Sequence, residues 1–254
     1  QAYPILFMVG QPLGIYWGAQ TDGIYANWEE ANNSGIAGAA PGEIKYVNNY
    51  VDLDESGQPL AIQEINFDDY VKIGDPNPDF TYSISNNFSY KNWDASFLFT
   101  GQKGGDLFWV DSWQLTGLQK STNVLTSSFQ NSWIAPITYE NGNFSYDPSI
   151  GNLNNASHPG AMIDNGKRAI SSDRNVYDGS FLRLKNINIG YNFNFSEGRN
   201  MRLFISGQNL IVWTDYPGYD PEVRTYTKNP QKRGVDFGTY PGTKSLLIGL
   251  KFNY

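Results

Sequence analysis

The sequence predicts an all-β fold, a portion of a large antiparallel β-barrel that crosses a membrane. Three observations support this prediction: stretches of alternating apolar and polar residues, connections that are alternately short and long, and the composition. Gly (26), Tyr (17) and Phe (15) are abundant among the 254 residues, and only 17% are charged. Alternation at a period of two gives a strand one apolar and one polar face.

Five stretches show the alternation clearly. They are residues 80–90, 92–100, 187–195, 202–212 and 245–254. A tilted strand needs roughly ten residues to cross a bilayer, which matches these lengths. One or two further strands are expected between Tyr3 and Tyr25.

The connections between the stretches favour a membrane barrel. Almost no loop separates residues 90 and 92, and only a short turn with Gly lies between Phe195 and Arg202. The other connections are long and cover about 26–79, 103–180 and 213–244. Outer-membrane barrels have tight periplasmic turns and long outer loops. If the C-terminus is periplasmic, all three long connections are extracellular. A soluble sandwich is the alternative.

The last stretch ends the chain on alternating apolar residues, Leu250, Phe252 and Tyr254. This ending is similar to the C-terminal signal by which outer-membrane barrels reach the barrel assembly machinery. The alternative is a terminal strand in a soluble sheet.

The number of expected strands predicts an incomplete barrel. Single-chain bacterial barrels need at least about eight strands, because an open edge leaves backbone groups unpaired in lipid. Six or seven strands cannot close, so we expect residues 1–254 to be a C-terminal barrel segment completed by other polypeptide. The start at Gln1, without an initiator Met or signal pattern, is read as a processed end or a cut edge.

Composition excludes several functional classes. A net charge of -7 argues against nucleic acid as a partner. The absence of Cys excludes thiolate chemistry, and the single His158 excludes multi-His metal centres. The acid pairs Glu29-Glu30 and Asp68-Asp69 are interpreted as solvated loop charges, and His158 as a loop histidine. No enzyme activity is therefore predicted.

A series of short motifs follows in order along nearly the whole chain. They are Gly10-Gln11-Pro12-Leu13-Gly14, Tyr16-Trp17-Gly18, Asp22-Gly23-Ile24-Tyr25, Pro41-Gly42-Glu43-Ile44-Lys45-Tyr46, Ile73-Gly74-Asp75-Pro76-Asn77-Pro78-Asp79-Phe80, Tyr90-Lys91-Asn92-Trp93-Asp94, Gly101-Gln102-Lys103-Gly104-Gly105-Asp106, Ser180-Phe181-Leu182-Arg183-Leu184-Lys185-Asn186-Ile187, Ser206-Gly207-Gln208-Asn209-Leu210 and Tyr219-Asp220-Pro221-Glu222. The ordered set resembles the C-terminal quarter of SusC/RagA-type TonB-dependent outer-membrane transporters of the Bacteroidota.

The resemblance implies a barrel of about 22 strands in the bacterial outer membrane, surrounded by its lipid. It also implies a plug and a TonB-contacting segment upstream, both absent from this chain, and a SusD-like surface lipoprotein as a lid. The function implied is the uptake of glycans or peptides. The alternative is a scaffold barrel subunit of a larger outer-membrane complex without transport activity. A weaker alternative is a soluble carbohydrate-binding β-sandwich.

One loop departs from the family pattern, which often has an Asp-x-Asn-x-Asp-Gly-like loop. Asp52, Asp54, Ser56 and Gly57 fit the start of a calcium loop, but Gln63 stands where the bidentate acid is needed. No cofactor is therefore expected. Calcium at Asp52, Asp54 and Ser56 remains a minor hypothesis beside an acidic solvated loop.

The tryptophans form two groups. Trp109, Trp113 and Trp133 fall in the longest connection and are candidates for contact with a sugar, a peptide or a partner protein. The alternative is that they form the small core of that connection. Trp17, Trp93 and Trp213 lie near strand ends, where membrane barrels have aromatic girdles.

Overall fold

The computed structural model describes residues 4–117, 123–134, 137–146, 156–160, 170–223 and 229–253. The chain divides into two compact units. The loop unit consists of Gln1–Asp75 and Phe108–Val176, and the sheet unit of Pro76–Leu107 and Tyr177–Tyr254. Among the described residues, no helix is both long and apolar enough to cross a membrane.

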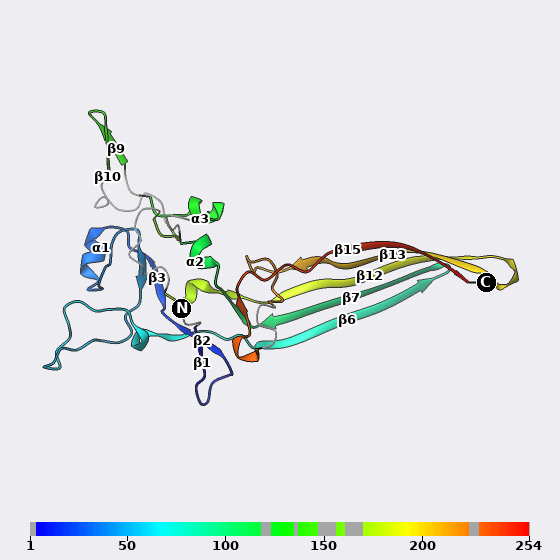
Figure 1. Cartoon of the computed structure of the whole chain (residues 1–254), viewed down its shortest axis with the longest axis horizontal. Coiled ribbons are helices and arrows are strands. Elements are labelled where there is room, and N and C mark those ends of the chain that lie inside the picture. The colour runs from blue at the N-terminus through cyan, green and yellow to red at the C-terminus, as the bar shows by residue number, and fades with distance from the viewer. Residues whose placement is uncertain are drawn as a thin grey trace. The chain divides into compact units, whose positions relative to one another are not determined.

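The sheet unit is built on five long antiparallel strands (Figure 1). They are β6 (Pro78–Tyr90), β7 (Trp93–Gly104), β12 (Phe181–Asn194), β13 (Asn200–Trp213) and β15 (Ser245–Asn253), in the spatial order β15-β13-β12-β7-β6. All five strands expected from the alternation are confirmed. Each has 9 to 14 residues, enough for a bilayer-spanning strand.

Strand β12 begins at Phe181, six residues before the expected start at Ile187. Its register shifts between Leu184, which pairs with Phe99, and Asn186, which pairs with the adjacent Leu98. Lys185 is thus an extra residue at a β-bulge. The bulge changes the phase of the apolar alternation, and this change hid the first part of the strand.

The connections of the sheet alternate in length as expected. Strands β6 and β7 join through a tight turn in which Lys91 has a φ of +54°. Strands β12 and β13 join through a 3-10 turn at Ser196–Gly198. The long connections leave from the opposite end of the sheet, here called the long-loop end (Figure 1). The other short elements are β8 (Asp106–Trp109), β11 (Val176–Asp178), β14 (Val235–Asp236) and the 3-10 turn Pro230–Lys232.

The described residues of the loop unit form only short elements. They are β1 (Ile5–Leu6), β2 (Ile15–Gly18), β3 (Thr21–Ile24), α1 (Trp28–Asn33), β4 (Ile44–Tyr46), the 3-10 turn Phe67–Asp69, β5 (Val71–Gly74), α2 (Ser112–Leu115), α3 (Thr126–Gln130), β9 (Ile137–Glu140), β10 (Asn143–Tyr146) and the 3-10 turn Asp173–Asn175. Strand β2 lies between β1 and β5, while β3 pairs with β4 and β9 with β10.

The one or two further strands expected between Tyr3 and Tyr25 correspond to three short strands among the described residues, none of them long enough to cross a bilayer. Strands β1, β2 and β3 have two, four and four residues, far fewer than the roughly nine that a bilayer-spanning strand needs. Gly10 and Gly14 take positive φ angles between β1 and β2 and interrupt the extended backbone there.

A compact aromatic core holds the loop unit together. Tyr16 and Phe108 are completely buried, and their rings meet edge to face at 5.8 Å between centroids. The ring of Trp113 meets Phe108 in the same way at 5.7 Å. Such pairs contribute roughly 0.5–1.5 kcal/mol beyond the burial of their area. The loop unit therefore has an apolar core of its own.

The acid pairs of the loop unit are not simply solvated. Asp68 is exposed, but Asp69 is 1% exposed. Its carboxylate accepts hydrogen bonds from the backbone N–H groups of Asn49, Tyr50 and Asn66. A buried carboxylate needs such donors, because an unpaired charge is unstable away from water. Asp69 therefore fixes the segment around residues 49–50 to the 3-10 turn.

Candidate functional site

The register of the five long strands separates a polar face from an apolar face. Residues that pair directly across an antiparallel sheet lie on the same face. One row consists of Asn87, Ser96, Asn188 and Ser206 on four strands, and it ends at Leu247 of β15. The adjacent row consists of Phe88, Ala95, Ile189, Ile205 and Ile248. In a membrane barrel of this size the polar face lines the interior and the apolar face meets lipid.

An arginine joins three strands near the short-turn end of the polar face. Arg202 of β13 forms a two-point ion pair with Asp94 of β7 and donates to Asn188 of β12 at 2.6 Å. The space for its guanidinium exists because Gly190 has no side chain. A Cβ at Gly190 would lie 2.4 Å from the Arg202 side chain. This contact stabilises the wall of the sheet.

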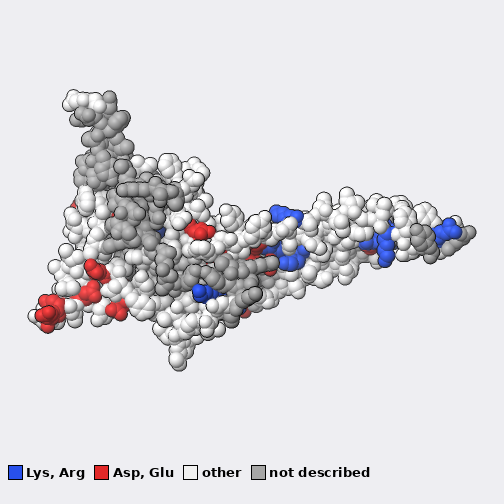
Figure 2. All heavy atoms as spheres, in the orientation of Figure 1, with Lys and Arg blue, Asp and Glu red and all other residues white. Residues whose placement is uncertain are grey.

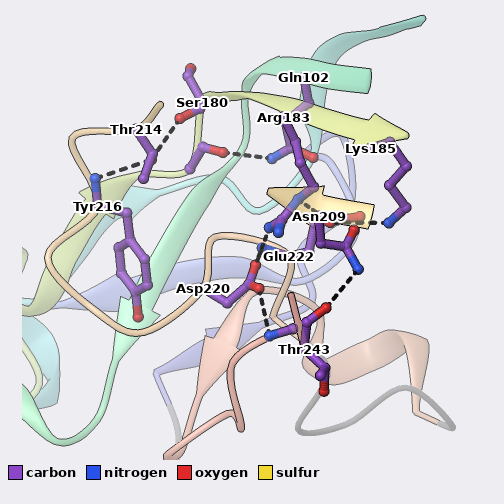
Figure 3. A network of polar contacts seen from close by, with 12 residues as sticks. Gln102, Ser180, Arg183, Lys185, Asn209, Thr214, Tyr216, Asp220, Glu222 and Thr243 are labelled. Atoms are coloured by element: carbon purple, nitrogen blue, oxygen red, sulfur yellow. Dashed lines mark hydrogen bonds and ion pairs between the residues drawn. The ribbon is translucent and has the colours of Figure 1, made fainter. Parts of the chain in front are cut away.

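A second, more deeply buried cluster lies toward the long-loop end of the polar face. We call Arg183, Lys185, Asp220 and Glu222 the mouth cluster (Figure 3). Arg183 Nη2 lies 2.6 Å from Asp220 Oδ1, and Arg183 Nε lies 2.8 Å from Glu222 Oε2 without the alignment of a hydrogen bond. Lys185 Nζ is 3.6 Å from the same Glu222 oxygen. Arg183 and Lys185 thus both approach the same carboxylate oxygen of Glu222.

Burial makes the mouth cluster energetically important. The side chains of Arg183 and Asp220 are 4% and 9% exposed. Removing one partner of a buried ion pair typically costs 3–5 kcal/mol, roughly, because the remaining charge has no solvent. The guanidinium also lies 5.7 Å from the centre of the Phe181 ring. The cluster is therefore a strong attachment of the segment around Asp220 to strand β12.

Asp220 also closes the connection between β13 and β15. Its carboxylate accepts hydrogen bonds from the backbone N–H groups of Glu222 and Gly242, at 2.9 and 3.1 Å. Asn209, at a φ of +51°, donates its side-chain amide to the carbonyl of Thr243 at 3.2 Å. These contacts hold the start and the end of this connection together on strand β12 (Figure 3).

Further hydrogen bonds fix the ends of the other long connections within the sheet unit. Gln102 Nε2 donates to the carbonyls of Gly104 and Gly179, and the Gly104 N–H donates to the Ser180 hydroxyl. The Thr214 hydroxyl donates to the Ser180 carbonyl at 2.9 Å. The long-loop end of strands β7, β12 and β13 is thus a single hydrogen-bonded frame.

A polar cavity of about 350 Å³ adjoins the mouth cluster. Its lining includes Thr81, Ser83, Thr100, Gln102, Phe181 and Glu222. Hydroxyl, amide and carboxylate groups of this kind bind polar solutes through hydrogen bonds. Before the start of β12, the Ser180 hydroxyl and N–H both donate to the Asp178 carboxylate, and the hydroxyl bond is the main reason that the pKa of this carboxyl lies below its ordinary value.

The tryptophans expected to contact a ligand or partner lie in the loop unit, two of them in its core. Trp109 and Trp133 are each 4% exposed, and Trp113 is partly buried. Trp133 Nε1 donates to the Ala26 carbonyl and Trp113 Nε1 to Asn175 Oδ1. These contacts fit the loop-core alternative, and a ligand role for the three remains a prediction. Trp93 and Trp213 lie about half-exposed near opposite ends of the sheet, as a girdle requires.

The calcium candidates use their carboxylates within their own loop. Asp54 Oδ1 accepts from the N–H groups of Ser56 and Gln58, and Asp52 Oδ2 accepts from that of Glu64. Gln63, at the position of the bidentate acid, accepts from the Asp52 N–H and donates to the Leu60 carbonyl, both at 2.6 Å. Within the described ranges, no group of three or more His, Asp or Glu side chains is placed to hold a metal ion.

The residues of the expected assembly signal lie on the apolar face. Leu250 pairs with Leu203, and Phe252 with Met201, across strands β15 and β13. Tyr254 lies outside the described residues. A role in assembly remains a prediction. His158, expected to be a loop histidine, forms an isolated bridge with Ser132 in the loop unit.

Sequence reasoning did not assign a role to Arg183, Asp220 or Glu222, although all three lie in the quoted motifs. The sequence did contain a local signal for this cluster. Arg183 and Lys185 flank Leu184 in an otherwise apolar stretch, and two cations so close together are unusual in a strand. The partner of Arg183 lies 37 residues further along the chain, so no local pattern connects them.

Comparisons with known proteins identify the fold. No family model matches the chain. It is 32% identical to TonB-dependent receptor P3 of Formosa agariphila, over 96% of this chain and 22% of that protein. It is 25% identical to TonB-dependent receptor SusC of Bacteroides thetaiotaomicron, over 79% of the chain and 18% of that receptor. The resemblance to SusC/RagA-type TonB-dependent receptors is confirmed.

Solved structures agree with the SusC/RagA-type assignment at the level of the fold. The RagAB peptide transporter matches with a TM-score of 0.66 and 18% identity, over 98% of this chain and 24% of that chain. The five-stranded sheet is thus part of a large antiparallel β-barrel. The chain spans about a fifth of the length of the curated relatives. The relatives are named as receptors, which confirms the prediction that the chain is not an enzyme.

Proposed function

We propose that this chain is the C-terminal barrel segment of a TonB-dependent nutrient importer of the SusC type in the bacterial outer membrane. In this proposal the polar face of strands β6, β7, β12, β13 and β15 lines the interior of the barrel. The apolar face meets outer-membrane lipid. The likeness to TonB-dependent receptors over 96% of the chain supports the assignment.

The mouth cluster is the main observation that supports a transport role. A barrel that served only as a scaffold needs paired strands and an apolar exterior. Here a buried Arg183–Asp220 pair additionally fixes a long connection to the interior-facing side of β12. Such an attachment holds the connection beside a polar cavity of about 350 Å³. We infer that the connection between β13 and β15 helps shape the passage for substrate.

The partners in this proposal are the rest of the barrel and its plug, the TonB complex and a SusD-like surface lipoprotein. TonB coupling is supported by the names of the relatives. The lipoprotein lid is supported by the likeness to the SusC receptor and to the RagAB transporter. TonB would act through parts of the receptor that lie outside these residues.

The substrate class in this proposal is a peptide or a glycan. The RagAB neighbour is a peptide transporter, which supports peptides. Exposed loop tryptophans would favour a glycan, but Trp109 and Trp133 are buried and offer little ring surface for stacking on a sugar. Peptides are therefore the substrate to test first.

The test is an uptake assay in cells whose only copy of the receptor is the full-length protein containing these residues. Radiolabelled mixed peptides and mixed oligosaccharides are supplied separately, with and without a protonophore that removes the energy for TonB. Accumulation of one class that is abolished by the protonophore supports the importer.

The scaffold alternative predicts a different result from the same cells. Neither substrate class would accumulate above the level of cells lacking the receptor, while a larger outer-membrane complex would still be recovered intact. That outcome would contradict the importer. Comparing Arg183→Lys with Arg202→Lys adds a control, because only Arg183 contacts the β13–β15 connection.

A further inference from the structure

A second cavity, of about 540 Å³, opens on the opposite side of the same strand ends. We call it the rim pocket, and its lining includes Phe80, Tyr82, Lys103, Ser180, Trp213 and Asp215. Its size falls within the range of pockets that hold small organic ligands, about 300–1,000 Å³. All its lining residues belong to the sheet unit.

The strand register places the rim pocket on the apolar face. Tyr82 pairs with Gly101, Gly101 with Leu182, and Leu182 with Trp213, so these four residues lie in one row on one face. The next row on that face consists of Ile84, Phe99, Leu184 and Ile211. The aromatic side of the pocket is therefore continuous with the rest of the apolar face, whereas the mouth cluster lies on the polar face.

A glycine sets the position of one aromatic wall of the rim pocket. Because Gly101 has no side chain, the Tyr82 ring lies across its place in the row. A Cβ at Gly101 would be 2.5 Å from that ring. Phe80 packs against Tyr82 with 5.9 Å between ring centroids, and Trp213 packs against Phe99 at 6.4 Å. The side of the pocket toward the middle of the sheet is thus aromatic.

The chemistry of the lining changes along the strand axis. Toward the middle of the sheet the pocket has the rings of Tyr82 and Trp213. Toward the long-loop end it has an ammonium, hydroxyls and a carboxylate, from Lys103, Ser180, Thr214 and Asp215. Lys103 is 59% exposed, and its ammonium lies 3.8 Å from the Asp178 carboxylate in a solvent-exposed ion pair. An amphiphilic ligand matches this change from apolar to polar lining. Its chains would lie on the apolar face, and its polar headgroup would lie at the long-loop end.

We propose that the rim pocket binds the headgroup of an anionic glycolipid, a phosphorylated sugar with acyl chains. The sugar ring lies against Tyr82 and Trp213, and its hydroxyls bond to Ser180, Thr214 and Asp215. The phosphate meets Lys103, and the acyl chains run along Phe99 and Ile84. This inference rests on the proposed function only in placing the receptor in an outer membrane.

The test uses the full-length receptor purified in mild detergent, with bisphosphorylated lipid A as the probe. Trp213→Ala and Lys103→Gln are compared with the matched controls Trp93→Ala, a similarly exposed outward tryptophan at the opposite end of the sheet, and Lys251→Gln on the polar face. Native mass spectrometry counts bound lipid against concentration. We expect roughly fivefold weaker binding for each pocket variant, about 1 kcal/mol of lost contact, and no change for the controls.

A second probe tests the class of ligand. Phosphatidylglycerol is anionic but has no sugar ring, so the proposal expects it to bind more weakly than lipid A and to respond little to Trp213→Ala. Equal loss of lipid A binding in Trp93→Ala and Trp213→Ala would contradict the placement of the lipid site at the rim pocket. Equal binding of the two lipids to the unaltered receptor would contradict the proposal that the ligand is a glycolipid.

The uptake assay separates this inference from the proposed function. Because the rim pocket lies on the face opposite the polar cavity, the Trp213→Ala receptor is expected to retain peptide uptake. Loss of lipid A binding without loss of uptake supports the rim pocket. A receptor that binds lipid A at this pocket but shows no uptake would contradict the importer and leave the rim pocket supported.

Discussion

The sheet unit and the loop unit differ in which side chains they bury. In the sheet unit, large apolar side chains such as Ile84, Leu246 and Ile248 are more than half exposed, and charged side chains such as Arg183 are buried. In the loop unit, Tyr16, Tyr25 and Phe108 are buried almost completely. The sheet unit is thus built for lipid outside and polar contents inside, whereas the loop unit is built like a water-soluble domain.

Different interactions stabilise the two units. The long strands are held by cross-strand pairing and by the bilayer, and ion pairs on the polar face add cross-links such as Arg202–Asp94. The loop unit has few long elements, so side chains from distant segments must hold it. Asp69, Trp113 and Trp133 do this through hydrogen bonds to backbone and side-chain groups. Figure 2 shows acidic side chains gathered on part of the surface of the loop unit.

The largest expected effect comes from breaking the mouth cluster. Arg183→Ala leaves Asp220 buried without its cation, and we expect the free energy of unfolding of the full-length receptor to fall by about 3 to 5 kcal/mol. Limited proteolysis should then cut within residues 214–244, which are held by Asp220. The control Arg202→Ala removes a more exposed pair and should cost about 1 kcal/mol or less. Equal effects of the two variants would contradict the special role of the cluster.

The second prediction concerns the buried acid of the loop unit. Asp69→Ala leaves three backbone N–H groups without their acceptor, so we expect a local loss of about 3 kcal/mol. Hydrogen–deuterium exchange of the amides of Asn49, Tyr50 and Asn66 measures it. The adjacent Asp68→Ala removes the same charge from an exposed position and should stay within about 0.5 kcal/mol. Faster exchange in the Asp68 variant than in the Asp69 variant would contradict the assignment.

A smaller effect is expected at Trp133. Trp133→Phe keeps most of the buried ring and removes the bond from Nε1 to the Ala26 carbonyl, which should cost about 1 kcal/mol. Exchange in the peptide that contains Ala26 is the measurement. The exposed Trp28→Phe serves as a control without effect. If Trp133→Phe instead abolished substrate uptake without changing exchange, the ligand role would replace the core role.

The two units also differ in how far the sequence alone predicts them. The five long strands follow from local alternation, because burial on one face repeats every second residue. The start of β12 was missed since the bulge at Lys185 shifts that repeat. The Arg183–Asp220 pair and the bonds of Asp69 to Asn49 and Tyr50 join residues about 20 or more positions apart. Contacts of that kind depend on how the connections fold, and no short motif records them.

The smallest expected effect is a pH dependence at helix α1. Burial alone would raise the pKa of Glu30, but the Ala26 N–H and the Lys45 ammonium bind its carboxylate and lower the pKa below its ordinary value of 4.5. Because the pKa is lower in the folded chain, the stabilisation is complete above pH 4.5 and is lost as the pH falls through the folded value. Exchange in residues 26–34, corrected for intrinsic rates, should therefore increase below pH 4.5. Glu30→Gln should abolish this increase, and its persistence in that variant would assign it to another group.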